Sequence, residues 1–317
     1  MFEIKPYTPK LKPQWDAFVA TSKNGLFLFY RDYMDYHQRF TDHSLLIYRR
    51  NKLYALLPAN REGDTLCSHQ GLTFGGLIVN SHFTATEAIT VLRLINAYLR
   101  DEGLRKVVYK AVPWLYQQQP SEEDLYAIYR TTNAKLVARD IASVIKLHVP
   151  LPCYRIRNSG MKKAKQLGII IKESDRWADF WQLLTQNLQT KYHVVPVHSL
   201  SEITLLKARF PDNIRLFTAR LDGLLAGTVV YEYGDVVHTQ YISASLKGKQ
   251  LHALDLLFDE LIHNVYRNKT YFDFGKSTER QGLTLNESLI YQKEGFGGRA
   301  VCYDWYEWNL CKSIIFP

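Results

Sequence analysis

The sequence has few cysteines and no long apolar run. Its four cysteines, Cys67, Cys153, Cys302 and Cys311, are far apart and form no C-x-x-C pair, which argues against a zinc site and against a disulfide framework. No stretch approaches the roughly 18 to 20 apolar residues that a membrane-spanning helix requires. Residues 1–18 contain no apolar core typical of a signal peptide. We therefore expect no metal, no membrane span and a reducing, cytoplasmic setting.

The motifs of nucleophilic catalysis are also missing. There is no Gly-x-Ser-x-Gly elbow, and the 10 histidines are scattered along the chain. No low-complexity tract is visible, and the charged fraction of 22% is not that of a disordered chain. With 317 residues, of which 46% are hydrophobic, the chain is long enough for two packed cores.

Positive charge is present but unevenly distributed. The net charge is +9, and residues 141–172 contain no acidic side chain. The basic residues of this segment are Lys146, Arg155, Arg157, Lys162, Lys163, Lys165 and Lys172. Such a patch attracts phosphates of a cofactor, of a nucleotide-linked substrate or of RNA, although a solvated basic connector has the same composition. Because aromatic residues are not regularly interleaved, specific binding of single-stranded RNA is not indicated, and we expect no DNA partner.

The two halves of the sequence repeat one order of elements. Each half begins with a helical Trp-x-x-Phe segment, at Trp15 and at Trp177, and continues with a strand hairpin, residues 44–57 and 214–231. A further strand, an amphipathic helix and a short strand follow. The expected ranges are 72–79, 86–100 and 106–110 in the first half and 236–243, 252–266 and 270–274 in the second.

We predict an α/β (α+β) fold of two similar domains, each a mixed, mainly antiparallel sheet flanked by helices. Pro150 and Pro152 interrupt the strand expected over 141–149, since proline cannot continue a ladder. The boundary is therefore placed between residues 150 and 151. The predicted domains are 1–150 and 151–317, with a short basic helix over 162–167 and a strand over 169–172 opening the second.

A loop between strand and helix in the second half is the first candidate site. It contains Ser245, Lys247, Gly248, Lys249 and Gln250. A helix N-terminus exposes unpaired N–H groups, and the two lysines add positive charge, so a pyrophosphate would be well accommodated. The alternative is an ordinary polar loop with a glycine for turning.

The second candidate lies between Tyr271 and Gly298. Asp273 could deprotonate an amine or cap the following loop. Lys293 could bind a phosphate, offset charge on a tetrahedral intermediate, or be merely solvated. Strand alternation predicts that Tyr241 points to the face opposite His238 and Gln240. Tyr241 could donate a proton to a leaving thiolate, or it could be a tyrosine of the core. We interpret Gly295, Gly297 and Gly298 as turn glycines with positive φ.

The order of elements from Arg215 to Trp308 resembles the GNAT acyltransferase superfamily. In that superfamily a Gln/Arg-x-x-Gly-x-Gly/Ala loop binds the acyl-CoA pyrophosphate, and the segment 245–250 keeps one of the glycines, Gly248. The C-terminal segment resembles the FemAB-like branch of tandem GNAT domains, in which a Tyr-x-x-x-Gly strand end precedes a Phe-Lys-x-x-Phe-Gly-like element. Tyr271 and Gly275 match the strand end, and Lys293 with Phe296-Gly297 matches the element that follows. Residues 155–165 resemble the first element of that branch's second domain.

The resemblance implies an N-acyltransferase with acetyl-CoA or another acyl-CoA as donor, acting on an amine in a cleft between the domains, the first of which binds no cofactor. The donor phosphates would contact Ser245, Lys247, Gly248, Lys249 and Gln250. Catalysis would involve Asp273 or Glu279 as base, Lys293 and Tyr241, and the amine substrate would contact Arg155, Lys162, Lys163 and Tyr291. Two alternatives remain open: aminoacyl transfer from aminoacyl-tRNA to a cell-wall precursor, and a non-catalytic GNAT-like binding protein.

Overall fold

The computed structural model describes residues 1–310, and Cys311 lies outside this range. The chain divides into two compact units. The first comprises Met1–Asp140, Arg280–Leu283 and the segment from Cys302 onward, and the second comprises Ile141–Glu279 and Thr284–Val301. The chain thus leaves the first unit at Asp140, before the prolines on which the sequence-based boundary rests.

The first unit contains two sheets and four α-helices within its described residues. The four-stranded sheet has the order β1-β3-β4-β7, and the strands β17-β8-β6-β5-β2 follow one another in the other sheet. The strands are β1 (Phe2–Pro6), β2 (Thr41–Asp42), β3 (Leu45–Arg49), β4 (Lys52–Leu57), β5 (Asn60–Glu62), β6 (Thr65–Cys67), β7 (Ile78–Val79), β8 (Lys106–Lys110) and β17 (Arg299–Asn309, which begins in the second unit). The helices are α1 (Lys12–Thr21), α2 (Arg31–Met34), α3 (Ala85–Asp101) and α4 (Glu123–Thr131).

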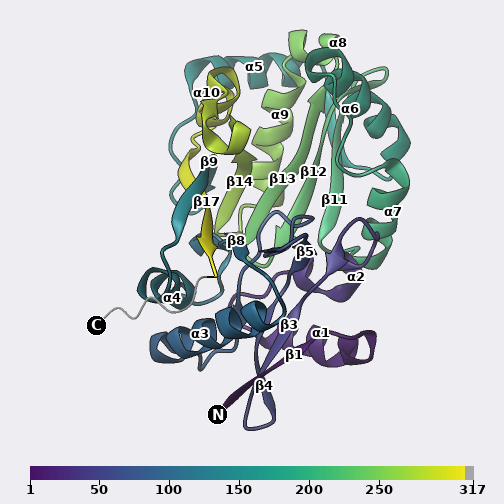
Figure 1. Ribbon diagram of the computed structural model, residues 1–317. Helices are drawn as coiled ribbons and strands as arrows, with labels where there is room; N and C mark the ends of the chain where they lie inside the picture. Colours follow the sequence, from purple (N-terminus) through teal and green to yellow (C-terminus); the bar gives the residue numbers. More distant parts are fainter. Residues whose placement is uncertain (311–317) are drawn as a thin grey trace. The chain divides into compact units, whose positions relative to one another are not determined.

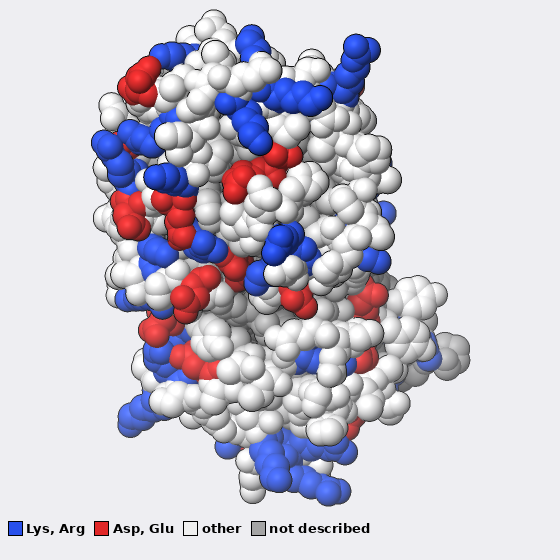
Figure 2. Space-filling model, turned by 180° about the vertical axis from the view of Figure 1, so that it is seen from behind, with Lys and Arg blue, Asp and Glu red and all other residues white. Residues whose placement is uncertain are grey.

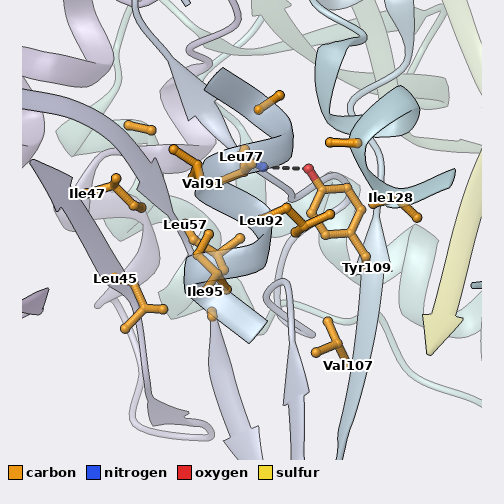
Figure 3. Close-up of a cluster of buried hydrophobic side chains, with 14 of the residues drawn as sticks. Leu45, Ile47, Leu57, Leu77, Val91, Leu92, Ile95, Val107, Tyr109 and Ile128 are labelled. Atoms are coloured by element: carbon orange, nitrogen blue, oxygen red, sulfur yellow. Dashed lines mark hydrogen bonds between the residues drawn. The ribbon is translucent and has the colours of Figure 1, made fainter. Parts of the chain in front are cut away.

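The core of the first unit lies between α3 and the hairpin β3–β4. Val91, Leu92 and Ile95 of α3 are buried against Leu45 and Ile47, as the helical spacing of the apolar residues predicts (Figure 3). The Tyr109 hydroxyl accepts a hydrogen bond from the Leu77 backbone N–H at 2.7 Å, which satisfies a polar group inside this core (Figure 3).

The second unit is a mixed sheet with helices on both faces. The strand order is β10-β11-β12-β13-β14-β9, and only the β13–β14 pair is parallel. The strands are β9 (Lys135–Lys146, which begins in the first unit), β10 (Ile170–Glu173), β11 (Ile214–Arg220), β12 (Leu224–Tyr233), β13 (Val236–Ala244), β14 (Tyr271–Lys276), β15 (Thr278–Glu279) and β16 (Thr284–Leu285). The helices are α5 (Arg155–Gln166), α6 (Trp177–Tyr192), α7 (Leu200–Arg209), α8 (Leu246–Gln250), α9 (Ala253–Glu260) with a π-helical turn to Val265, and α10 (Glu287–Glu294).

Each face of this sheet buries a different set of side chains. Helices α5 and α9 share one core with Val230, Val237 and Phe272 of the sheet, whereas α6 and α7 lie beside β11, β12 and β13 (Figure 1). On the α6 side, Phe180 packs directly on Gly227, where a Cβ would lie 2.7 Å from the ring. This mixed, mainly antiparallel α/β architecture confirms the predicted fold class.

Four predicted elements differ from the observed ones. The strand expected over 141–149 is β9, which begins at Lys135 and ends at Lys146, before Pro150. The strand expected over 72–79 is reduced to Ile78–Val79, because Gly75 lies too close to Ser68 for any side chain and Gly76 has φ +84°. The helix expected over 252–266 begins at Ala253, since His252 has φ +57° and separates α8 from α9. The basic helix expected over 162–167 is longer, because α5 begins at Arg155.

Candidate active site

Strands β13 and β14 diverge after a short parallel pairing. The paired residues are Val236–Tyr271, Val237–Phe272 and His238–Asp273, whereas β13 continues to Ala244. Gly275, with φ +69°, lies at an irregularity where the register of β14 against β9 shifts between Asp273 and Lys276. Among the described residues, the parallel pairing of β13 with β14 ends at His238, and residues 239–244 of β13 continue without β14.

We call the place where β13 and β14 separate, after His238 and Asp273, the fork. A pocket of about 810 Å³ opens there. Residues of both sheet faces line it, because the diverging strands leave a gap between the α6 side and the α9 side. Its side chains come from α6, the end of β13, α8, α9, β14 and α10, all within the second unit. Among the described lining residues, the charged ones are Lys191, Lys247, Lys249 and Lys293, and none is an aspartate or a glutamate.

The interior of the pocket is apolar. Phe258, Phe274 and Phe296 are each at most 4% exposed and pack against one another, with ring centroids 5.0 to 5.6 Å apart. Leu254 of α9 and Leu184 of α6 add aliphatic surface. The pocket therefore combines an aromatic and aliphatic wall with positive charge.

Lys293 connects α10 to the fork. Its Nζ donates hydrogen bonds to the Gly275 carbonyl at 2.9 Å and to the Lys276 carbonyl at 2.7 Å, at the irregular end of β14. The side chain is buried, and burial lowers the pKa of its ammonium group to about 8, while Asp273 acts in the opposite direction. Lys293 is thus a buried pocket lysine held by two backbone carbonyls, and the solvated alternative is wrong.

The predicted phosphate loop forms helix α8 at the edge of the pocket. Ser245 is its N-cap, and the Ser245 hydroxyl accepts the Gly248 N–H at 2.9 Å. A Cβ at position 248 would lie 2.1 Å from the Leu225 carbonyl oxygen, so Gly248 lets α8 pack closely on β12. The exposed Lys247 and Lys249 and the half-buried Ser245 line the pocket, whereas the exposed Gln250 does not.

Asp273 lies in the middle of β14 and is completely buried. One carboxylate oxygen accepts the Gly275 N–H at 2.7 Å, and the other lies 3.0 Å from Nδ1 of His238 on the neighbouring strand. Asp273 does not line the pocket. These contacts attach it to the last parallel pair of the fork and to the turn at Gly275.

The prediction that Tyr241 and His238 point to opposite faces is wrong. Tyr241 pairs with Val229 and Thr239 pairs with Val230, so Gln240 is an extra residue in a β-bulge. The bulge reverses the alternation and brings Tyr241 to the face of His238. The Tyr241 hydroxyl lies 2.6 Å from Nδ1 of His198 and its ring packs against Trp181, outside the pocket lining.

The remaining predicted residues lie at the surface. Glu279 is exposed on β15 and accepts a hydrogen bond from Asn286 at 3.2 Å. Tyr291 of α10 is 53% exposed, with its ring centroid 5.5 Å from that of Tyr154. Arg155, Lys162 and Lys163 are exposed on α5. The structure does not bring any of these five into the pocket lining.

Sequence reasoning missed the contribution of α6. Asn187 donates hydrogen bonds to the Ser243 hydroxyl at 2.7 Å and to the Ala244 carbonyl at 2.9 Å, so it holds the end of β13 where the pocket begins. Gln186, Thr190 and Lys191 line the same side. In the sequence, the only sign of this role is that α6 ends in polar residues after an apolar stretch. No local pattern relates these residues to β13, which lies more than fifty residues further along the chain.

The described residues contain no group of three histidine, cysteine, aspartate or glutamate side chains that could hold a metal ion. Within residues 1–310, no helix has the length and apolar character needed to cross a membrane.

The second unit contains a GNAT-like domain. Residues 155–281 match the family model described as an acetyltransferase (GNAT) domain. This match covers α5 to β14, and therefore both strands of the fork, and it confirms the resemblance inferred from the sequence. None of the curated protein sequences compared with the chain matches it.

Solved structures extend the likeness to the whole chain. FemX is similar with a TM-score of 0.67 and 10% identity, covering 97% of each chain. L-PGS from Bacillus licheniformis has a TM-score of 0.60 and 11% identity, covering 98% of this chain and 94% of its own. A tandem GNAT protein from the clavulanic acid biosynthesis pathway has a TM-score of 0.51 and 12% identity, covering 99% of this chain and all of its own. The chain therefore has the fold of FemAB-like tandem GNAT proteins.

Proposed function

We propose that the second unit transfers an acyl group from a phosphate-bearing acyl donor, foremost an acyl-CoA, to an amine. The observation that carries this proposal is the pocket at the fork of β13 and β14. Its described lining residues include four lysines, many apolar side chains and no carboxylate. A thioester donor combines the same two properties, an anionic phosphate part and a neutral reactive arm.

Each part of the donor has a counterpart in the pocket. Lys247 and Lys249 would pair with the donor phosphates, and the α8 N-terminus, capped by Ser245, would add its partial positive charge. The thioester would lie along β13 beyond its pairing with β14, where a backbone N–H group would hydrogen-bond the carbonyl oxygen. Lys293 would add positive charge on the β14 side of the same space.

The reaction needs no covalent enzyme intermediate. The lone pair of a neutral amine attacks the thioester carbonyl carbon and forms a C–N bond, and the oxygen becomes negatively charged. The C–S bond then breaks, the thiolate leaves, and the proton lost by the nitrogen ends on the sulfur, so the products are an amide and a free thiol. Positive charges around the pocket favour the neutral form of the attacking amine.

Asp273 and Tyr241 have supporting roles in this proposal. Asp273 contacts His238 and the Gly275 N–H, and would preserve the shape of the fork. Tyr241 with His198 would hold the β13 bulge against α6. Glu279 is left as a candidate base only for an acceptor that reaches β15.

The principal test is calorimetric binding of coenzyme A. The double variant Lys247→Ala/Lys249→Ala should bind it about tenfold more weakly, since it loses two charge-assisted contacts. The matched control is Lys162→Ala/Lys163→Ala, which removes the same charge from exposed positions of α5 and should change the dissociation constant less than twofold. Equal effects of the two double variants, or no binding at millimolar ligand, would contradict the proposal.

Aminoacyl transfer from aminoacyl-tRNA is the second candidate, because the chain shares its fold with FemX and because α5 carries exposed lysines. Salt-sensitive binding of charged tRNA, without binding of coenzyme A, would favour it. If the protein binds coenzyme A but transfers no acyl group to any of a panel of amines, the third alternative, a non-catalytic GNAT-like binding protein, is favoured.

A further inference from the structure

Resting on the proposed function, we infer that Asn187 of α6 selects acyl donors whose connecting arm carries an amide N–H, and that its side-chain oxygen accepts this N–H. Asn187 is half-buried and lines the pocket. Neither the binding of the phosphates nor the transfer step, as proposed above, uses this side chain. It would be a specificity-determining residue of the donor site.

Two hydrogen bonds fix the orientation of the Asn187 amide. Its Nδ2 donates to the Ala244 carbonyl oxygen at 2.9 Å and to the Ser243 hydroxyl at 2.7 Å. A backbone carbonyl can only accept, so the side-chain atom that faces it has to be the nitrogen. The NH₂ group has two protons, and these two bonds use both of them. The amide cannot flip without losing its bond to Ala244.

The oxygen of the same amide is left for a ligand. Among the described residues no group donates a hydrogen bond to Oδ1 of Asn187, and this atom is not one of the buried polar atoms that lack a partner, so solvent reaches it. An amide oxygen only accepts hydrogen bonds. A ligand group that binds Oδ1 therefore has to be a donor, whereas phosphate oxygens and a thioester carbonyl are acceptors and cannot pair with it.

Asn187 is bonded to the place where the two parts of the proposed donor site meet. Residues 239–242 of β13, along which the thioester would lie, come just before Ser243 and Ala244. Helix α8, at which the phosphates would lie, follows directly, with Ser245 as its N-cap. The arm that connects thioester and phosphates would therefore pass residues 243 and 244, and with them Asn187. In coenzyme A this arm contains two secondary amides, each with one N–H.

The same geometry disfavours donors without such an arm. In an acyl phosphate or an acyl adenylate only acceptor oxygens lie between the phosphorus and the reacting carbonyl. With such a donor the half-buried Oδ1 of Asn187 would lose water and gain no partner, which costs free energy. The site would thus favour amide-bearing thioesters over acyl phosphates and acyl adenylates.

The first experiment changes the ligand and uses the unaltered protein. Calorimetry compares coenzyme A with two analogues, in each of which one amide N–H of the arm is replaced by an ester oxygen. One of the two analogues should bind at least about fivefold more weakly than coenzyme A, the loss expected for one hydrogen bond. If both analogues bind as tightly as coenzyme A, the inference is wrong.

The second experiment changes the protein. Asn187→Leu, which is similar in size and lacks the oxygen, should bind coenzyme A about fivefold more weakly and no longer distinguish it from the weaker analogue. Ser243→Ala removes one bond that holds the amide but keeps Oδ1, and should still distinguish the two ligands. Gln189→Leu, at an exposed position of α6 outside the described pocket lining, is the matched control and should behave like the parent.

The outcomes distinguish this inference from the proposed function. If the unaltered protein does not bind coenzyme A at millimolar ligand, both are overturned. If Asn187→Leu binds coenzyme A and its analogue with the same ratio of affinities as the parent does, Asn187 only holds the end of β13, and the inference alone is overturned. If Asn187→Leu does not fold, the two analogues bound to the unaltered protein still decide.

Discussion

At the scale of single residues, Lys293 is the most informative side chain of the site. Its ammonium group is buried, donates to two carbonyls of β14, and has a pKa lowered to about 8 from 10.5. A lysine whose folded-state pKa is lowered binds its proton less tightly in the folded than in the unfolded chain. Its contribution to stability therefore rises as the pH increases from about 8 towards 10.5.

Replacing Lys293 by methionine tests the direction of this pH dependence of stability. The free energy of unfolding of the unaltered protein, minus that of Lys293→Met, should increase by about 2 kcal/mol between pH 7.5 and pH 10. Urea unfolding at several pH values measures the difference, and Lys162→Met on the exposed face of α5 should show no such trend. A difference that stays constant over this range would mean that Lys293 titrates as an ordinary lysine.

At the scale of elements, the contact of α5 with α9 depends on Gly160. A Cβ at this position would lie 2.2 Å from Oδ2 of Asp255 and 2.7 Å from Nδ1 of His252, at the start of α9. Arg157, one turn earlier, donates to Asp255 and lies 5.5 Å from the ring of Phe296. The glycine therefore lets a basic helix approach the elements that form the apolar wall.

Gly160→Ala should destabilise the protein by about 2 kcal/mol, because overpacking exceeds the roughly 1 kcal/mol by which alanine favours a helix over glycine. Chemical denaturation gives the value. Ser159→Ala, at an exposed position of the same helix, is the control and should stay within about 0.5 kcal/mol of the parent. A stabilised Gly160 variant would show that α5 does not need this close contact.

At the scale of the whole molecule, the net charge of +9 and the lysines of the pocket favour anionic ligands. On the back view several basic side chains lie at the upper end of the second unit, the end at which α5, α6 and α8 are labelled (Figures 1 and 2). An ion atmosphere screens such attraction within about 10 Å at 0.1 M salt.

Raising sodium chloride from 50 to 500 mM should therefore weaken coenzyme A binding by about tenfold. Calorimetry at the two salt concentrations measures the dissociation constant of coenzyme A. Binding that is insensitive to salt would contradict phosphate recognition by Lys247 and Lys249.

Local sequence patterns were sufficient for most of the elements in the second unit. The Asp222–Gly223 turn marks the β11–β12 hairpin, and its observed φ values of 55° and 157° show why these residue types occur there. The apolar spacing after His252 predicts α9, and the loop from Ser245 predicts a helix start beside a ligand site. Of the three glycines after α10, however, only Gly297 has a positive φ, and Gly295 has the helical φ of −59°.

By itself the sequence determined the α/β class, the likeness to GNAT proteins and the segments that supply Lys247, Lys249 and Lys293. Only the tertiary structure decided where the β13–β14 pairing ends, that a bulge at Gln240 reverses the direction of Tyr241, and that α6 lines the pocket. The physical reason is that hydrophobic period and turn chemistry act within a few residues, whereas strand register and the burial of a lysine depend on partners far along the chain.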